Sequence, residues 1–354
     1  MTNPDFWRGR RVLVTGHTGF KGGWLALWLA RMGATVHGLA LPPDTTPALY
    51  DLARVGDHVQ GRMLDITDAP ALARAVADAA PEVVFHLAAQ PLVRLSHDEP
   101  LRTFATNVMG TANLLEACRT LPALRAIIVV TTDKVYENRE WVWPYRETDP
   151  LGGKDPYSAS KSAAEMVVLA WRRSYFEGAG VPVLTARGGN VIGGGDWSAD
   201  RLVPDLFRAL AAGRPLEIRA PASVRPWQHV LVLCHGYLAL AQAAITGAVP
   251  GEGAWNFGPL PPDCVSVRAL LDRFAAAGVQ AQIEIGNGDR KPESRMLALD
   301  SSKARAELGW NPTLDLSEAV DWATEWYQEA AKGADMNAAT FAQIDRYANR
   351  MNSA

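Results

Sequence analysis

The sequence has few cysteines and no strong net charge. Only Cys118, Cys234 and Cys264 occur among 354 residues, and this odd, widely separated set fits neither a disulfide framework nor paired metal ligands. Lysine and arginine total 35 against 38 acidic residues, and the formal charge of −3 gives no field for gathering nucleic acid or anionic lipid. We therefore expect no metal centre, no nucleic-acid partner and a reducing, cytoplasmic setting.

Long apolar segments are also missing from the sequence. The longest apolar runs, such as residues 126–130, are far too short to cross a bilayer, and residues 1–11 lack the apolar centre of a signal peptide. We expect no membrane association. Hydrophobic residues at 48% and charged residues at 21% are instead typical of a globular protein with a sizeable core. The length favours two domains or one large α/β unit.

Short β-branched runs alternate with helical patterns along the first half of the chain. The predicted strands are residues 12–14, 35–37, 83–85 and 127–130, and the predicted helices are residues 22–32, 71–79 and 106–119. This alternation predicts an α/β fold, a Rossmann-type doubly wound parallel sheet with helices on both faces.

The regularity weakens after Thr185, where glycine and proline breaks accumulate. We predict a cofactor-binding domain over residues 1–187, to which later segments return, and a smaller domain over residues 188–354 that mainly binds substrate. An amphipathic helix is expected near residues 317–332, followed by a surface helix or a loosely held tail.

A glycine loop at residues 15–22 directly follows the first predicted strand and opens a helix. Gly16 permits a tight turn, Gly19 lets the backbone approach a pyrophosphate, and Gly22 allows the helix to pack closely on the sheet. The helix amino terminus adds unpaired N–H groups and positive potential. This context predicts a dinucleotide site, although the spacing is G-x-x-G-x-x-G and not G-x-G-x-x-G.

The sequence after the second predicted strand carries no clear ribose ligand. Pro42 lies where an acidic residue often binds the ribose hydroxyls, and Asp44 is either the nearest substitute or a solvated turn residue. Since no arginine lies there for a 2′-phosphate, NAD is favoured over NADP. Asp65 either reaches the adenine or caps the helix that follows it.

Two further segments carry side chains that can move protons. Tyr157 and Lys161 are four residues apart, so a helix places them on one face, and a nearby ammonium lowers the pKa of a phenol. Thr132 ends the fourth predicted strand, where open α/β sheets bind ligands. Asp133 and Lys134 follow it and are either an extra acid and base or a surface ion pair.

In these motifs the chain resembles the extended short-chain dehydrogenase/reductase superfamily and, more narrowly, the CDP-glucose 4,6-dehydratases. The glycine loop and Y-x-x-x-K are typical of the superfamily. The more specific motifs lie in TTDKVYENREWVW from Thr131, RGGNVIGGGDW from Arg187 and RPWQHV from Arg225, and the match also includes FHLAAQPLVRLS from Phe85.

The resemblance implies a dehydration with internal redox chemistry on a nucleotide-diphosphate hexose, with CDP-glucose favoured. Tyr157, helped by Thr132 and Lys161, is expected to take the C4 hydroxyl proton while hydride passes to NAD. Lys134 is then expected to take the C5 proton and Asp133 to protonate the departing C6 hydroxyl. Which of these two residues carries which proton stays open.

The resemblance also implies binding residues and an assembly. The expected cofactor contacts, besides Tyr157 and Lys161, are Gly16, Thr18, Gly19, Phe20, Lys21, Gly22, Asp65, Ile66, Leu87, Ala88 and Ala89. The expected substrate contacts are Gln90, Asn190, Arg201, Arg225 and His229. A homodimer or homotetramer is expected to form through the helix over residues 106–119 and the helix that carries Tyr157.

Two alternatives remain at this point. An NAD-dependent nucleotide-sugar epimerase would use Tyr157 without eliminating water, and a dehydratase for another nucleotide hexose would differ only in its binding residues. A scaffold protein that has lost its chemistry is disfavoured because all five candidate catalytic residues are present. The resemblance is imperfect at Pro42, where aspartate is frequent, and at Met296, where tyrosine is frequent.

Overall fold

A computed structural model describes residues 3–286 and 294–353 of the chain. Its centre is a sheet of seven parallel strands. In chain order the strands are β1 (Arg11–Thr15), β2 (Thr35–Ala40), β3 (Gln60–Met63), β4 (Val83–His86), β5 (Ala126–Val130), β6 (Val183–Gly188) and β10 (Ala254–Phe257). In space they run β10-β6-β5-β4-β1-β2-β3.

The strand order reverses at β1, which pairs with β2 on one side and with β4 on the other. Val12 lies beside Val36 of β2 and beside Val83 of β4, both in parallel register. Loops after β1 and β4 therefore diverge and leave a crevice at their carboxyl ends, where doubly wound sheets bind nucleotides. The predicted fold class is confirmed, and the glycine loop lies at this switch point.

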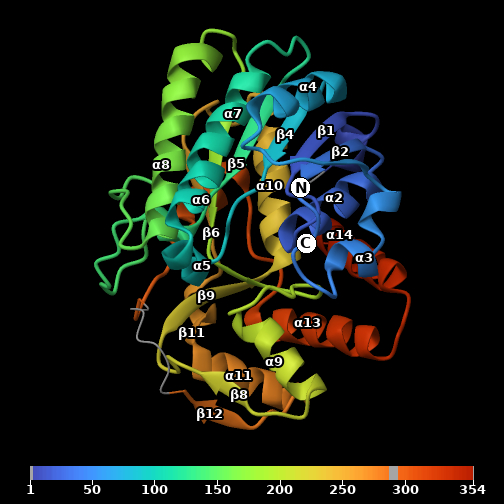
Figure 1. Ribbon diagram of the computed structural model, residues 1–354, viewed down its shortest axis with the longest axis vertical. Coiled ribbons are helices and arrows are strands. Elements are labelled where there is room, and N and C mark those ends of the chain that lie inside the picture. Colours follow the sequence, from blue (N-terminus) through green and yellow to red (C-terminus); the bar gives the residue numbers. More distant parts are fainter. Residues whose placement is uncertain (1–2, 287–293, 354) are drawn as a thin grey trace.

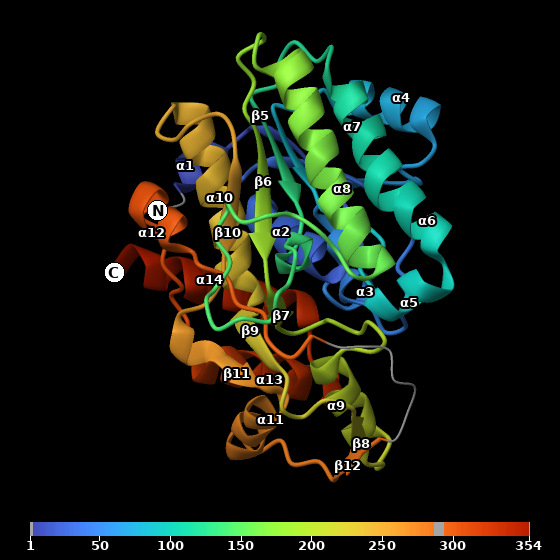
Figure 2. The same cartoon turned by 90° about the vertical axis from the view of Figure 1, so that its left-hand side faces the viewer.

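Helices cover both faces of the large sheet (Figures 1 and 2). One face carries α4 (Ala69–Ala79), α6 (Pro100–Phe104), η2 (Ala105–Met109), α7 (Gly110–Cys118) and α8 (Pro156–Trp171). The opposite face carries α2 (Phe20–Arg31), α10 (Val230–Thr246) and α14 (Met336–Ser353). The single helix predicted over residues 106–119 is thus two elements, because η2 is one turn of π-helix.

The lower part of the molecule in Figure 1 is built from smaller sheets and helices. Strands β11 (Cys264–Ser266), β9 (Val224–His229) and β7 (Asn190–Ile192) form one sheet, and β12 (Ile283–Ile285) pairs with β8 (Leu216–Ile218). Around them lie α9 (Leu202–Ala211), α11 (Val267–Ala276) and α13 (Leu316–Ala331). The crevice beyond the large sheet faces this part of the molecule.

The segment after the amphipathic helix α13 is helical and packed. In α14, Ile344 and Tyr347 are fully buried, and the ring of Tyr347 lies edge-on to Trp28 of α2. This agrees with the predicted surface helix and not with a loosely held tail. Among the residues that the structure describes, no helix is both long and apolar enough to span a bilayer.

The remaining elements are short. They are α1 (Pro4–Trp7), α3 (Leu49–Leu52), η1 (Val55–Asp57), α5 (Val93–Asp98), η3 (Asp133–Val135), η4 (Arg172–Phe176), η5 (Pro261–Asp263) and α12 (Ser302–Leu308). Of these, α5 and η3 matter most for the site, because they follow β4 and β5 at the carboxyl edge of the sheet.

Candidate active site

The glycine loop is shaped by close backbone contacts. Gly16 adopts φ +79°, and a Cβ there would lie 2.8 Å from the amide nitrogen of Ala88. A Cβ on Gly22 would overlap the Gly16 carbonyl oxygen. At Gly19, by contrast, the nearest atom to a Cβ would be that same oxygen at 3.4 Å. The loop therefore leaves room over Gly19, where a pyrophosphate could approach.

The amino terminus of α2 has no side chain to cap it. Gly19 is the N-cap residue, so the amide groups of the first turn, at Phe20, Lys21 and Gly22, are served by no capping side chain. Unsatisfied amides and the helix dipole together favour an anion. The residues present thus fit a dinucleotide diphosphate.

The side chains expected near the adenosine lie at the ends of β2 and β3. Thr18 donates through Oγ1 to the Leu41 carbonyl at 2.8 Å, which ties the glycine loop to the end of β2. Asp65 accepts from the Thr67 amide at 2.8 Å through Oδ1. Ile66 is buried beneath Gly110, where a Cβ would meet its Cδ1 at 2.5 Å. Asp65 thus stabilises its own turn through Oδ1, and its predicted contact with the adenine stays a prediction.

The segment after β4 closes the other side of the crevice. The amides of Leu87 and Ala88 both donate to Thr15 Oγ1 at 3.1 Å, which holds residues 87–89 against the glycine loop. The Gln90 side chain donates to the Leu92 carbonyl and to Thr103 Oγ1, at 3.1 and 2.8 Å. Gln90 therefore braces the loop in this structure, and its predicted contact with substrate stays a prediction.

Thr132, Asp133 and Lys134 form one hydrogen-bonded group at the carboxyl end of β5. Thr132 Oγ1 donates to Asp133 Oδ1 at 2.9 Å and accepts from the Lys134 amide at 3.3 Å. The Lys134 ammonium lies 3.5 Å from the same carboxylate oxygen. Asp133 Oδ2 is buried without a hydrogen-bond partner. A buried, unpartnered carboxylate oxygen is unusual and suits a group that exchanges a proton with a ligand.

Tyr157 and Lys161 lie in the first turns of α8, which begins at Pro156 after an Asp155 cap. Burial raises the pKa of Tyr157 to about 12, while a hydrogen bond with Thr132 acts in the opposite direction. The Lys161 ammonium donates to the Val130 carbonyl at 3.0 Å. Burial, reinforced by the Lys21 ammonium, lowers the pKa of Lys161 to about 8. The expected lowering of the phenol pKa is thus reversed in this structure, because burial outweighs the other influences.

A second lysine faces the same crevice from α2. Burial, together with the Arg201 guanidinium, lowers the pKa of Lys21 to about 8, whereas Asp133 and Asp196 act to raise it. Arg201 pairs with Asp196 at 2.9 Å and also interacts electrostatically with Tyr157. Lys21, Arg201, Asp133 and Tyr157 therefore share one electrostatic environment, which gathers cations where an anionic diphosphate would bind.

The remaining predicted substrate residues, Asn190, Arg225 and His229, have different surroundings in the structure. Asn190 on β7 has a buried Oδ1 without a partner, as expected of a side chain that awaits a ligand. Arg225 on β9 donates to the Val224 carbonyl at 2.8 Å. His229 is fully buried, caps α10 by accepting from the Leu231 amide, and lies between the rings of Trp24 and Trp322. His229 therefore has a structural role here, and its contact with substrate stays a prediction.

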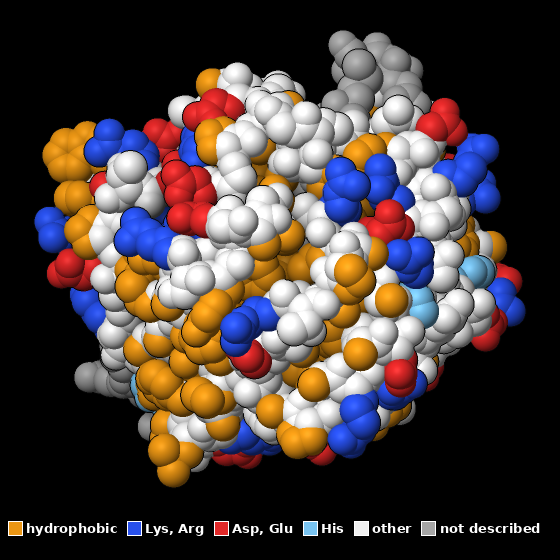
Figure 3. Space-filling view, turned by 90° about the horizontal axis from the view of Figure 1, so that it is seen from above, with side chains coloured by type: hydrophobic (Ala, Val, Ile, Leu, Met, Phe, Trp, Pro, Cys, Tyr) orange, Lys and Arg blue, Asp and Glu red, His pale blue; other side chains and the backbone are white. Residues whose placement is uncertain are grey.

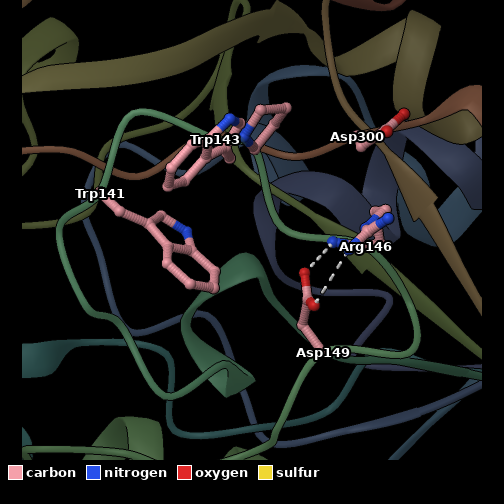
Figure 4. Close-up of a pocket in the computed structure, with 6 residues that line it drawn as sticks. Trp141, Trp143, Arg146, Asp149 and Asp300 are labelled. Carbon is pink, nitrogen blue, oxygen red and sulfur yellow. Dashed lines mark hydrogen bonds and ion pairs between the residues drawn. The ribbon is translucent and has the colours of Figure 1, made fainter.

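A pocket of about 460 Å³ is lined by residues of the loop between η3 and α8 and by Asp300. Figure 4 shows Trp141 and Trp143 on one side and the Arg146–Asp149 ion pair on the other. None of the predicted catalytic or cofactor residues lines it. The Trp141 ring stacks on the buried Tyr145 ring, which in turn stacks on the buried Tyr136 ring. The pocket is therefore distinct from the candidate active site.

The sequence matches the family described as GDP-mannose 4,6 dehydratase over residues 13–322. The chain belongs to this family. The matched range includes the glycine loop, the Thr132–Lys134 group, Tyr157 and Arg201, so the GDP-mannose 4,6-dehydratase family match covers every part of the site described above. The resemblance to nucleotide-sugar dehydratases, inferred from the motifs, is confirmed.

Curated relatives and solved structures agree with the family. The chain is 44% identical over 353 residues to the CDP-glucose 4,6-dehydratase of Salmonella typhimurium, and the match covers 98% of each chain. It is 30% identical to the dTDP-glucose 4,6-dehydratase of Xanthomonas campestris, over 89% of this chain and 92% of that one.

Among solved structures, the dTDP-glucose 4,6-dehydratase of Streptomyces venezuelae, determined with NAD and TYD bound, superposes with a TM-score of 0.77. It is 26% identical and covers 92% of this chain and 99% of its own. The UDP-glucose 4-epimerase of Thermotoga maritima gives 0.76 at 25% identity, over 90% of this chain and 99% of its own.

Two residues of the site were missed by reasoning from the sequence. Asp196, which pairs with Arg201, lies in the GGGDW motif, but only its place in that motif marks it. Glu165, which follows Lys161 by one helical turn, is buried and fully hydrogen-bonded. The same four-residue spacing that marks Tyr157 and Lys161 could have identified Glu165. In the described part of the chain, no cluster of metal-ligating side chains occurs.

Proposed function

We propose that this protein catalyses the NAD-dependent 4,6-dehydration of CDP-glucose, which yields CDP-4-dehydro-6-deoxy-glucose and water. One observation carries the proposal: the Thr132 hydroxyl donates to the Asp133 carboxylate and also interacts with the Tyr157 phenol. An acid thus lies beside the groups that handle the C4 hydroxyl, and a lysine lies beside the acid. The resemblance to the Salmonella CDP-glucose 4,6-dehydratase supports the choice of substrate.

NAD, when bound, supplies the acceptor for hydride from C4 and the donor of hydride to C6. The glycine loop and the first-turn amides of α2, which no side chain caps, would hold its diphosphate. Lys161, close to the carboxyl end of β5, would bind and orient the adjoining ribose.

The residues of the chain divide the reaction into oxidation at C4 and elimination across C5 and C6. Tyr157 accepts the proton of the C4 hydroxyl, and the hydroxyl of Thr132 stabilises the developing charge. Because the phenol has a high pKa when buried alone, a cation must lower that pKa before Tyr157 can act as a base. Arg201 already acts to lower the pKa of Tyr157, Lys161 lies one helical turn away on α8, and bound NAD would add its own positive charge.

Elimination follows once C4 is a ketone, since the ketone acidifies the proton on C5. Lys134, as a neutral amine, takes the C5 proton, and Asp133, as a neutral acid, gives its proton to the C6 hydroxyl, which leaves as water. The buried, unpartnered Oδ2 of Asp133 is the oxygen from which this proton would be given. When hydride returns to C6, Lys134 gives its proton back to C5, so the sugar has lost one water and has undergone no net oxidation.

The substrate is tested by offering CDP-, dTDP-, UDP- and GDP-linked hexoses separately. The expected result is that CDP-glucose loses one water by mass spectrometry and gives a keto sugar with an alkali-shifted absorbance. If another nucleotide hexose alone reacts, the nucleotide assignment is wrong and the mechanism survives. If a sugar is epimerised without losing water, the protein is an epimerase of the same fold.

We also propose that the protein forms a homodimer through the helices on the α8 face of the sheet. Large apolar side chains are exposed there, on α6 to α7 and on α8 to η4: Leu101, Phe104, Met109, Met166 and Tyr175. Figure 3 shows apolar side chains gathered on the side of the molecule where α7 and α8 lie. Exposed apolar patches of this kind favour protein contacts. The cytoplasmic location and the division into residues 1–187 and 188–354 stay predictions from the sequence.

A further inference from the structure

Directly behind the candidate active site lies a buried ion pair that the reaction does not use. Glu165 of α8 and Arg187 of β6 have side chains only 5% and 4% exposed. The guanidinium donates from Nε to Glu165 Oε1 and from Nη2 to Oε2, both at 2.9 Å. This two-pronged contact is the geometry in which arginine and a carboxylate bind most rigidly.

The ion pair is bonded to both ends of the segment that holds the acid and the amine. Thr131, the residue before Thr132, donates through Oγ1 to Glu165 Oε1 at 2.6 Å. Tyr136, two residues after Lys134, accepts from Arg187 Nη1 at 2.8 Å through its hydroxyl. Thr131 and Tyr136 thus bracket the Thr132–Lys134 group on either side, and both are bonded to the same ion pair.

The same ion pair is also joined to the other half of the site. Glu165 lies four residues after Lys161 on α8, so both side chains leave the same face of that helix. The Glu165 charge acts to raise the pKa of Lys161, against the larger effect of burial. A displacement of the ion pair would therefore move the helix of Tyr157 and Lys161 relative to the end of β5.

Every hydrogen-bonding position of the carboxylate is used. Besides Thr131 and Arg187, Thr185 donates to Glu165 Oε2 at 2.8 Å. Tyr136 in turn donates to Asn256 Oδ1 at 2.7 Å, which ties the group to the edge strand β10. The network thus joins α8, β5, β6, β10 and the loop after η3 into one rigid unit.

Stability alone gives little reason for such a network. Burying two opposite charges costs desolvation energy that their attraction barely offsets, and apolar replacements are often as stable or more so. A fixed geometry is what a fully satisfied buried network provides in return. Because the reaction needs proton transfers at C4 and across C5 and C6, the two sets of groups must be held in fixed positions around one substrate.

We propose that Glu165 and Arg187, with Thr131 and Tyr136, are positioning residues that fix the Asp133–Lys134 pair relative to Tyr157 and Lys161. None of the four needs to touch substrate or cofactor. The inference rests on the proposed function, because it assigns the network to the two half-reactions of dehydration. Its signature is a loss of turnover without a matching loss of substrate affinity.

Two mild variants test this proposal. Thr131→Val and Tyr136→Phe each delete one hydroxyl and leave the ion pair in place. We expect kcat for CDP-glucose to fall about 10- to 100-fold while KM changes less than about 3-fold, as misplacement of reacting groups by an ångström predicts. Thr131→Ser, which restores the hydroxyl, should recover kcat to within about 3-fold of the wild type. Glu165→Gln, which keeps the shape and removes the charge, should lower kcat further.

Thr340→Val is the matched control. Thr340 is also fully buried, and its hydroxyl bonds Trp326 Nε1 at 3.0 Å, but it lies in α14 on the other face of the sheet. We expect this variant to lose some thermal stability and to keep kcat. If Thr131→Val and Tyr136→Phe behave like Thr340→Val, with kcat unchanged, the network has only a structural role and the proposal is overturned.

A second measurement separates this inference from the proposed function. Amide hydrogen exchange of a peptide that spans residues 131–136 should become faster in Thr131→Val and Tyr136→Phe, and stay unchanged in Thr340→Val. If the wild-type protein dehydrates no nucleotide hexose, the proposed function fails, and the exchange rates still decide whether the network fixes this segment. Equal exchange in all variants would contradict the positioning role even in an active dehydratase.

Discussion

The hydroxyl of Thr132 donates a hydrogen bond to Asp133 Oδ1 at 2.9 Å and also interacts with the phenol of Tyr157. The side chain expected to assist oxidation at C4 is therefore bonded to the side chain expected to assist loss of the C6 hydroxyl. This contact places the groups for oxidation at C4 and for loss of the C6 hydroxyl side by side, so the sugar can undergo both steps in one position. It also means that the two steps should be separable by substitutions on either side of Thr132.

Replacement of Asp133 and of Lys134 should separate the two proton transfers of elimination. Asp133→Asn should lower dehydration by about 10²- to 10⁴-fold, the usual contribution of a positioned acid, yet leave Lys134 able to exchange the C5 proton. Lys134→Met should lower both dehydration and exchange. The measurement is deuterium uptake at C5 of CDP-glucose recovered from heavy water, alongside keto-sugar formation.

Tyr157→Phe is the control for this comparison, because it should abolish C5 exchange and dehydration together. Exchange at C5 that persists in Lys134→Met and disappears in Asp133→Asn would reverse the two assignments. Wild-type dehydration in the double variant Asp133→Asn/Lys134→Met would remove both residues from the mechanism.

The pKa values of the two buried lysines predict how cofactor binding depends on pH. The pKa of Lys21, like that of Lys161, is lowered from 10.5 to about 8, mainly by burial. Each lysine therefore loses its charge as the pH rises through about 8 in the free protein, and an anionic diphosphate binds the charged form better. Affinity for NAD should fall across this range, and binding near pH 8 should take up protons.

Calorimetric titration with NAD in two buffers of different ionisation enthalpy measures this proton uptake. Lys21→Met should bind NAD more weakly and take up fewer protons, and it should raise the pKa of Lys161, since the charge of Lys21 contributes to lowering it. Lys332→Met is the matched control, because Lys332 is exposed and pairs with Glu329. Proton uptake by Lys21→Met equal to that of the wild type would exclude Lys21 from the diphosphate site.

Reasoning from the sequence located the sheet and the glycine loop because these depend on local signals. Strands such as β5 are short β-branched runs. Glycine is required at position 22 because a Cβ would overlap the Gly16 carbonyl oxygen, and at position 16 because a Cβ would meet the backbone of Ala88. Helix α10 carried no such signal. It is apolar on all sides because it is buried on all sides, so it lacks amphipathic periodicity.

The candidate site was predictable only where its residues are close in the sequence. Tyr157 and Lys161 are marked by helical spacing, and Thr132, Asp133 and Lys134 are consecutive. The electrostatic proximity of Lys21 to Lys161 depends on the whole fold, and no local pattern encodes it. The same holds for His229, whose capping of α10 between two tryptophans became evident only from packing.

The glycine loop should respond differently at two positions. Gly22→Ala forces a Cβ into the Gly16 carbonyl oxygen, so it should cost about 1–3 kcal/mol of stability, as overpacking does, and should abolish NAD binding. Gly19→Ala meets nothing closer than 3.4 Å and should fold normally. Its methyl group would still occupy the space of the diphosphate and weaken NAD binding about tenfold or more, which is about 1.4 kcal/mol.

Thermal melting with and without NAD separates the two effects at the glycine loop. Gly178→Ala is a control in an open turn, where a Cβ would meet nothing within 4 Å, and it should change neither quantity. A Gly19→Ala protein that melts like the wild type and is stabilised equally by NAD would show that the diphosphate lies elsewhere.

The predicted homodimer can be tested at its apolar patch. Met109 and Met166 are 56% and 50% exposed, on η2 and on α8, which contact each other. Burial of such side chains against a second copy removes apolar surface from water, and a charge placed there would have to be desolvated. Met109→Glu/Met166→Glu should therefore be monomeric by light scattering at concentrations where the wild type is dimeric. Ile285→Glu, at a residue 68% exposed on β12, should leave the dimer intact. Dissociation by Ile285→Glu, with the double variant still dimeric, would move the interface to the lower part of the molecule.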